Sequence, residues 1–211
     1  MMKLRGIGIA ISLAGLALLT PVNSSLRTSS QLMRELYNAP TQNEMRRSSA
    51  MQELKSRGWL EGFQSYRPVF EHVLSYRIMD ETIENKLAGY GIEPLALLMA
   101  IAAKESSIEH YRNGQRRVVK KSYDAGGANV GIMQIKPLTA KSVGINNVYG
   151  VADNILGAAM YVAANLETCR TVKGALTNYG AGPNGRCNNS SYSGDVAENY
   201  WLFYEVLSTE K

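Results

Sequence analysis

The sequence has few of the residues on which metal, nucleotide and serine-nucleophile chemistry depend. It contains two histidines and two cysteines in 211 residues, and His72 and His110 lack the clustering with other ligands that a metal site needs. No arrangement around Ser106 or Ser107 supplies the histidine base of a serine nucleophile. The glycine-rich "GAGPNG" lacks the Lys-Ser/Thr pair of a phosphate-binding loop. We therefore expect no metal and no cofactor.

Charge is also modest. The formal net charge is +5 and 19% of the residues are charged. No dense Lys/Arg stripe with interleaved aromatic residues indicates a nucleic-acid partner. The one basic cluster, "RNGQRRVVKK" at residues 112–121, is interpreted as a solvated loop. A mild positive charge suits an anionic polymer such as the cell wall.

One long apolar run lies near the start of the sequence. Lys3 and Arg5 precede thirteen uncharged residues, "IGIAISLAGLALL", and "TPVNSS" then ends the pattern. This layout is typical of a secretory signal peptide over residues 1–24, with Val22 and Ser24 at the cleavage site, because the run is too short to span a bilayer comfortably. An uncleaved anchor is the alternative. Both predict an exported protein, in the periplasm or at the cell wall, that meets the membrane only through this segment.

The two cysteines, Cys169 and Cys187, are eighteen positions apart. An exported compartment favours a disulfide between them over a metal pair or a nucleophile. Closing a loop of that length stabilises a fold by about 3 kcal/mol in the chain-entropy model. Two buried free thiols remain the alternative.

Helical spacing is common and strand-like alternation is scarce, so the fold class is expected to be mainly α. The length allows one good core. We expect an amino-terminal helical elaboration over residues 25–67 and the main domain over residues 68–208. A long loop or short hairpin is expected within residues 107–130, and loops of this length are often functional.

Glycine and proline residues predict several helix ends. A helix is expected to follow Pro68 and to stop at Gly89, and Pro94 is expected to begin the next one. Helices are also expected within residues 29–38, 43–57, 137–142, 152–169, 172–185 and 195–207, and the helix that begins at Pro94 is expected to run to about residue 106.

A glutamate closes the most apolar of these helices, "PLALLMAIAAKES". Leu98, Ile101 and Ala102 recur with Glu105 at three- and four-residue steps, so the carboxyl group faces the same way as core side chains. Apolar surroundings disfavour the charged carboxylate and raise its pKa. The cleavage of a glycosidic bond needs a proton donor of this kind. The alternative is a glutamate at a helix end that reaches into solvent.

Four motifs occur in a fixed order: "ES" at residues 105–106, "GIMQI" beginning 26 residues after Glu105, then "ADNILGAAMYVAAN" and "NYGAGPNG". Together they resemble the motif series of the soluble lytic transglycosylase (SLT) domain family, whose fold is like that of goose-type lysozyme. The resemblance covers about residues 90–204, including "YGIEP", and residues 25–67 fall outside it. It implies a lysozyme-like helical domain over residues 68–208.

The resemblance also implies roles for single residues. Glu105 matches the family's one catalytic acid/base, and Ser106 matches the neighbour that orients the substrate or the carboxylate. Tyr179 matches the tyrosine of a "YNAGP"-like motif near the catalytic carboxyl. Here Gly180 replaces the usual asparagine, so a side-chain contact to the sugar is expected to be missing. Asn154 matches an asparagine that we interpret as mainly structural.

The "GIMQ" segment matches a turn that lines the substrate in this family. Gly131 is expected to let the backbone approach the sugar, and Ile132 lies in the same substrate-binding turn. Met133 is expected to form an apolar floor, and Gln134 to make a polar contact.

The family relationship would make the protein a lyase that cuts the β-1,4 bond between N-acetylmuramic acid and N-acetylglucosamine in peptidoglycan without adding water. Its partners would be glycan strands and, for local wall opening, a secretion, conjugation or phage apparatus that spans the envelope. A hydrolytic muramidase is one alternative, with Glu109, Asp124 or Asp153 as the second carboxylate that most glycosidases need. A catalytically weak, peptidoglycan-binding component of such an apparatus is the other.

Overall fold

The computed structural model describes residues 42–76, 83–112, 115–116, 127–182, 186–188 and 191–208. They belong to one compact unit, Thr41–Lys211. The expected signal peptide and residues 25–41 of the expected elaboration lie outside the described residues. Within the described ranges, no helix has the length and apolar character needed to cross a membrane.

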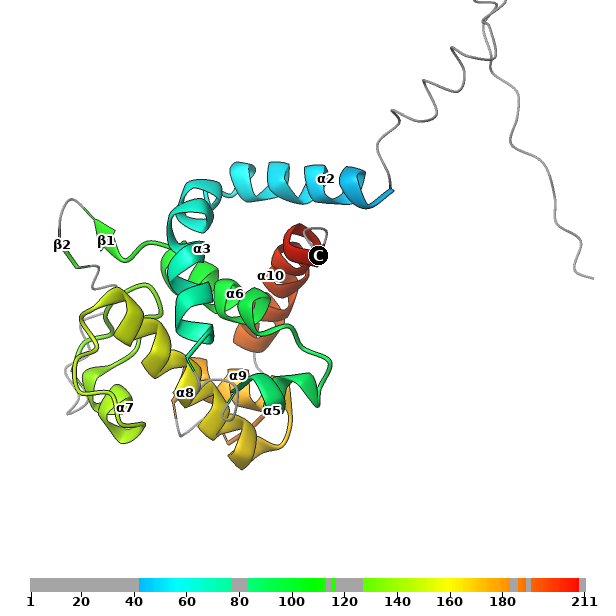
Figure 1. Cartoon of the computed structure of the whole chain (residues 1–211). Coiled ribbons are helices and arrows are strands. Elements are labelled where there is room, and N and C mark those ends of the chain that lie inside the picture. The colour runs from blue at the N-terminus through cyan, green and yellow to red at the C-terminus, as the bar shows by residue number, and fades with distance from the viewer. Residues whose placement is uncertain are drawn as a thin grey trace, which may run out of the picture. The chain divides into compact units, whose positions relative to one another are not determined.

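The unit is mainly helical, as expected (Figure 1). Its helices are α2 (Gln42–Ser56), α3 (Leu60–Leu74), α5 (Asn85–Ala88), α6 (Pro94–Ser106), α7 (Pro137–Ser142), α8 (Val151–Cys169), α9 (Val172–Ala181) and α10 (Ser191–Ser208). A hairpin pairs β1 (Tyr111–Arg112) with β2 (Gln115–Arg116), at the start of the segment expected to hold a loop or hairpin.

Helix α6 lies at the centre of the unit (Figure 1). Every residue from Leu95 to Ala103 is buried, so the helix is enclosed on all sides, beyond the single buried face expected from the sequence. Helices α3 and α10 pack against α6, while α8 contacts α3, α7 and α9. Because α6 is held from several directions, its last turn has a fixed position.

Helix α3 differs from the expectation that a helix follows Pro68. It begins at Leu60 and contains Pro68, although a proline inside a helix removes one backbone hydrogen bond. Phe63, Phe70 and Val73 are buried on this helix, and the burial of these side chains outweighs the lost bond. The border expected between residues 67 and 68 therefore falls inside α3. The expected stop at Gly89 holds for the short helix α5.

Both ends of α6 are fixed by local chemistry. At its start, the Glu93 carboxylate accepts a hydrogen bond from the Ala96 N–H at 2.5 Å, and Pro94 is the first helical residue, as expected. At its end, Ser107 and Ile108 both have left-handed backbone angles, with φ of 57° and 60°. This conformation is unfavourable for a β-branched residue. Gly62 on α3 packs on this turn, where a Cβ atom would lie 2.6 Å from the Ile108 carbonyl oxygen.

Candidate active site

Glu105 lies in the last turn of α6, where the sequence places it. Its side chain is half-buried, because α10 packs along this helix. Burial raises the pKa of the carboxyl group, while a hydrogen bond from Tyr192 and the positive charge of Lys104 act in the opposite direction. The burial effect is the larger one, so Glu105 keeps its proton to a higher pH than an exposed glutamate.

Tyr192 is a residue of this site that no sequence pattern indicated. Its hydroxyl group, from the first turn of α10, donates a hydrogen bond to Glu105 Oε1 at 2.6 Å. A length in this range is typical of a hydrogen bond to a charged carboxylate. The bond also fixes the direction in which the carboxyl group points. No motif marks Tyr192, which lies 87 positions from Glu105 in sequence.

Gly180 makes room for the Tyr192 ring. A Cβ atom at position 180 would lie 2.5 Å from Tyr192 Cγ, whereas carbon atoms in contact are normally about 3.5–4.0 Å apart. The expectation that a side-chain contact from position 180 to the sugar is missing stays a prediction. The space beside the glycine is filled by the ring that holds Glu105.

Tyr179 stands between two other tyrosines. Its ring centroid lies 5.7 Å from that of Tyr161 on α8 and 6.3 Å from that of Tyr192. Its hydroxyl group donates a hydrogen bond to the Met133 carbonyl oxygen at 2.8 Å. Burial and the nearby Glu105 carboxylate raise the pKa of Tyr179 and Tyr192 well above the ordinary value. Both hydroxyl groups therefore remain donors at neutral pH. No sequence pattern indicated Tyr161.

The turn that carries "GIMQ" is held from the inside by Asn154. The Met133 N–H donates to Asn154 Oδ1 at 2.8 Å, and Asn154 Nδ2 donates to the carbonyl oxygens of Val130 and Val148 at 3.0 Å each. Gly131 has φ of 75°, and a Cβ atom there would lie 2.5 Å from the Asn154 amide. Gly131 thus makes room for the Asn154 amide, and the expected approach of its backbone to a sugar stays a prediction.

The other side chains of this turn also point inward. Ile132 and Met133 are fully buried, and Gln134 is 6% exposed. Gln134 Nε2 donates to the Gly131 carbonyl oxygen at 2.7 Å. The turn contacts the site through its backbone: the Met133 carbonyl oxygen accepts the hydrogen bond that holds the Tyr179 hydroxyl group. The contacts expected between the Met133 and Gln134 side chains and a sugar stay predictions.

Ser106 and His110 fix the Ile132 peptide from both sides. Ser106 is buried, and its hydroxyl group donates to the Ile132 carbonyl oxygen at 2.7 Å. The Ile132 N–H donates to His110 Nδ1 at 3.0 Å, so the ring hydrogen is on Nε2, 3.2 Å from the Tyr149 carbonyl oxygen. Ser106 is therefore placed to orient the turn next to Glu105, and its expected role in orienting the substrate or the carboxylate stays a prediction.

None of the described acidic candidates joins Glu105. Within the described part of the chain, the groups that shift the Glu105 pKa through charge or a hydrogen bond are Tyr192 and Lys104, and neither is a carboxylate. Glu109 lies 3.5 Å from Arg112 in an ion pair. Asp153 lies in the first turn of α8, where a negative charge is favourable. Asp124 lies outside the described residues.

The expected disulfide is present between Cys169 and Cys187. It joins the end of α8 to the segment after α9, and the Cys187 N–H also donates to Asn178 Oδ1 at 3.0 Å. Because α9 carries Tyr179 and Gly180, the disulfide anchors the helix against which Tyr192 packs. Among the described residues, no group of three His, Cys, Asp or Glu side chains could hold a metal ion.

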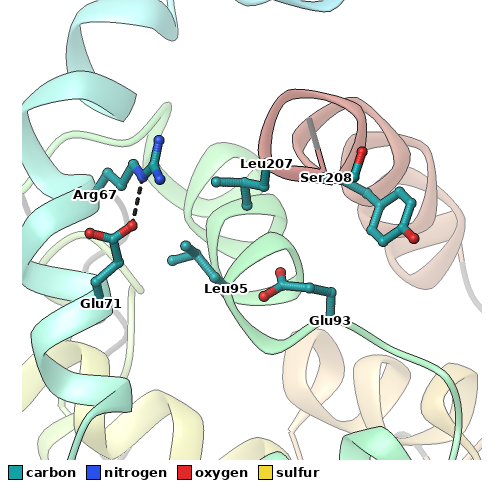
Figure 2. A pocket seen from close by; sticks show the side chains of 7 residues that line it. Arg67, Glu71, Glu93, Leu95, Leu207 and Ser208 are labelled. Atoms are coloured by element: carbon teal, nitrogen blue, oxygen red, sulfur yellow. Dashed lines mark hydrogen bonds and ion pairs between the residues drawn. The ribbon is translucent and has the colours of Figure 1, made fainter. Parts of the chain in front are cut away.

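A separate hollow of about 370 Å³ lies at the opposite end of α6 (Figure 2). Figure 2 shows Leu95 and Leu207 facing each other across it and Arg67 bonded to Glu71, at 2.7 Å. Leu95 is ten residues from Glu105, or about 15 Å along the helix axis. The Glu93 carboxylate at its edge caps α6. This hollow is therefore separate from the Glu105 site.

Comparisons with known proteins agree with this arrangement. The family described as "Transglycosylase SLT domain" matches residues 81–202. A protein named "Transglycosylase" from Enterobacteria phage PRD1 is 33% identical over 127 residues, which are 59% of this chain and 43% of the phage protein. The chain thus matches less than half the length of that relative. No solved structure matches the chain significantly.

Proposed function

Because the chain belongs to the transglycosylase SLT domain family, we propose that it is a lytic transglycosylase of peptidoglycan. The bond cleaved is the β-1,4 bond between N-acetylmuramic acid and N-acetylglucosamine. The products end in 1,6-anhydro-N-acetylmuramic acid, since no water is added. The observation that carries this proposal is one half-buried carboxyl group, Glu105, held by a tyrosine hydroxyl and with no second carboxylate acting on it among the described residues.

In the first step, protonated Glu105 gives its proton to the glycosidic oxygen. The bond between that oxygen and the anomeric carbon breaks, and the N-acetylglucosamine side leaves with a new hydroxyl group. The raised pKa of Glu105 supports this step, because the carboxyl group holds its proton until the oxygen accepts it.

In the second step, the 6-hydroxyl group of the muramoyl sugar attacks the anomeric carbon. Glu105, now a carboxylate, accepts the hydroxyl proton and returns to its starting state. Tyr192 supports this step, because its hydrogen bond to Oε1 stabilises the carboxylate form and keeps it aimed at the sugar. One carboxyl group serves both steps, unlike the pair that most glycosidases use.

Export fits the same activity. The substrate lies outside the cytoplasm, and a disulfide such as Cys169–Cys187 persists in oxidising compartments. A signal peptide at residues 1–24 would deliver the protein there. The similarity to a phage transglycosylase supports a role in local wall opening for a phage or another apparatus that spans the envelope.

Mass spectrometry of the products tests the proposal. Purified peptidoglycan is incubated with the wild-type chain, with Glu105→Gln, and with Glu167→Gln as a matched carboxyl-to-amide control on the exposed face of α8. We expect anhydro-muropeptides from the wild type and the control, and none from Glu105→Gln. Products heavier by one water would identify a muramidase instead, and an inactive wild type that still binds the wall would identify a binding component.

A further inference from the structure

A polar groove of about 300 Å³ opens beside the end of the catalytic helix, on the side of α3. One wall is the first half of α3, and the other is the segment that directly follows Glu105. Gly62 and Ile108, which pack closely together, lie where the two walls meet. The polar and aromatic residues that line the groove are Glu61, Ser65, Tyr66, Ser107, Glu109 and Tyr111.

We propose that this groove is a further glycan subsite, which binds sugar residues of the peptidoglycan strand beyond the cleaved bond. This inference rests on the proposed function, since it takes the substrate to be a long glycan strand. The α3 wall lies before residue 81, where the match to the SLT family begins. The subsite would therefore give residues 58–66 a role in substrate binding.

The lining of the groove suits a sugar ring, which has apolar C–H faces and hydroxyl groups at its edge. Tyr111 is 45% exposed, and its ring is supported by an edge contact with His110 at 4.5 Å between centroids. A supported tyrosine offers apolar area with little loss of side-chain freedom on binding. Tyr66 supplies a second ring on the opposite wall.

Polar groups for the sugar hydroxyls are available in the same place. Within the part of the chain that the structure describes, the side chains of Glu61, Ser65, Tyr66 and Ser107 make no hydrogen bond or ion pair. A carboxylate accepts hydrogen bonds from hydroxyl groups, while serine and tyrosine both donate and accept them. Among the described residues that line the groove are two glutamates and no lysine or arginine, a lining that disfavours an anionic ligand such as a phosphate polymer.

The groove is also close enough to serve the same strand. Ser107 follows Glu105 by two residues, which is at most about 7 Å of extended chain. That distance is similar to the length of one sugar unit. A strand bound at Glu105 can therefore continue into the groove without a long gap.

Steady-state kinetics on substrates of two lengths tests the subsite. The substrates are long glycan strands without stem peptides and a tetrasaccharide of the same repeat. For Tyr111→Ala and Tyr66→Ala we expect KM for the long strands to rise about tenfold with kcat unchanged, because an aromatic contact is lost. The tetrasaccharide kinetics should stay within twofold of wild type. Tyr90→Ala is the matched control: Tyr90 is also 45% exposed, but it precedes the opposite end of α6.

A further variant, Glu61→Gln, and a binding measurement test the subsite even where a Tyr→Ala variant folds poorly or the protein has no activity. Glu61→Gln removes one exposed charge and should raise KM for long strands several-fold. In an inactive Glu105→Gln background, Tyr111→Ala should weaken binding of the long strands about tenfold, even if the wild type makes no anhydro products. The subsite is refuted if every variant matches Tyr90→Ala or if both substrates are affected equally.

Discussion

The contact between Gly180 and Tyr192 can be tested by adding a single methyl group. In Gly180→Ala, the new Cβ atom would lie 2.5 Å from Tyr192 Cγ. Normal contact needs about 3.5 Å or more, so the ring must move by about 1 Å. A shift of that size lengthens the 2.6 Å bond from the Tyr192 hydroxyl to Glu105 beyond hydrogen-bond range.

For Gly180→Ala we expect a larger loss of activity than of folding stability. A hydrogen bond to a charged group contributes about 1.5–3 kcal/mol, which corresponds to a fall in kcat of about tenfold to 150-fold. Overpacking costs about 1–3 kcal/mol. Alanine is about 1 kcal/mol more favourable than glycine inside a helix and offsets part of that cost. Gly180→Asn, which places the family's usual residue here, should act in the same direction.

The assay is a double-mutant cycle with Tyr192→Phe, read by the rate of anhydro-product formation. If Gly180 acts through the Tyr192 hydroxyl group, the double variant will be no slower than Tyr192→Phe alone. Tyr192→Phe should also move the alkaline fall of kcat/KM to higher pH, because the lost bond lowers the Glu105 pKa in the wild type. Full activity of Gly180→Ala, or additive effects in the cycle, would refute this account of the glycine.

Three further predictions follow from the same contacts. Glu105→Gln should unfold at a higher temperature than wild type at pH 7 and at nearly the same temperature below about pH 4. A carboxyl group with a raised pKa stabilises the fold only while it is protonated, and this contribution is lost as pH rises through the folded-state pKa. An equal difference in unfolding temperature between the two proteins at both pH values would contradict this prediction. Reduction of Cys169–Cys187 should lower the free energy of unfolding by about 3 kcal/mol in denaturant titrations, and an unchanged midpoint would argue against this stabilisation. Asn154→Ala leaves three buried backbone groups without partners and should cost at least about 3 kcal/mol, whereas Asn147→Ala, at an exposed turn, should cost little.

The bounds of several helices were predictable from the sequence, because they depend on residues that are close together in the chain. Helix α6 begins at Pro94 and ends at Ser106, as proline at the start and the apolar run indicated. The bounds of α7 agree with the expectation, and α8 begins one residue earlier than expected. The disulfide followed from the number of cysteines and the expected compartment.

The direction of single side chains was less predictable. Gly131, Met133 and Gln134 were expected to meet a sugar, which stays a prediction; the structure adds that all three contact the protein interior or the turn itself. The "GIMQ" motif indicates a turn with left-handed backbone angles. It does not indicate which side of the turn faces solvent. That depends on Asn154, which fills the space inside the turn.

The sequence by itself determined that Glu105 ends an apolar helix and that the family motifs follow it in order. Helix periodicity and turn chemistry are properties of residues close together in the chain. Only the tertiary structure decided that Tyr192 holds the carboxyl group, that Gly180 makes room for its ring, and that α3 forms a wall beside the site. These contacts join residues on different helices or turns that are between 12 and 87 positions apart, and such contacts are set by how whole helices pack against one another.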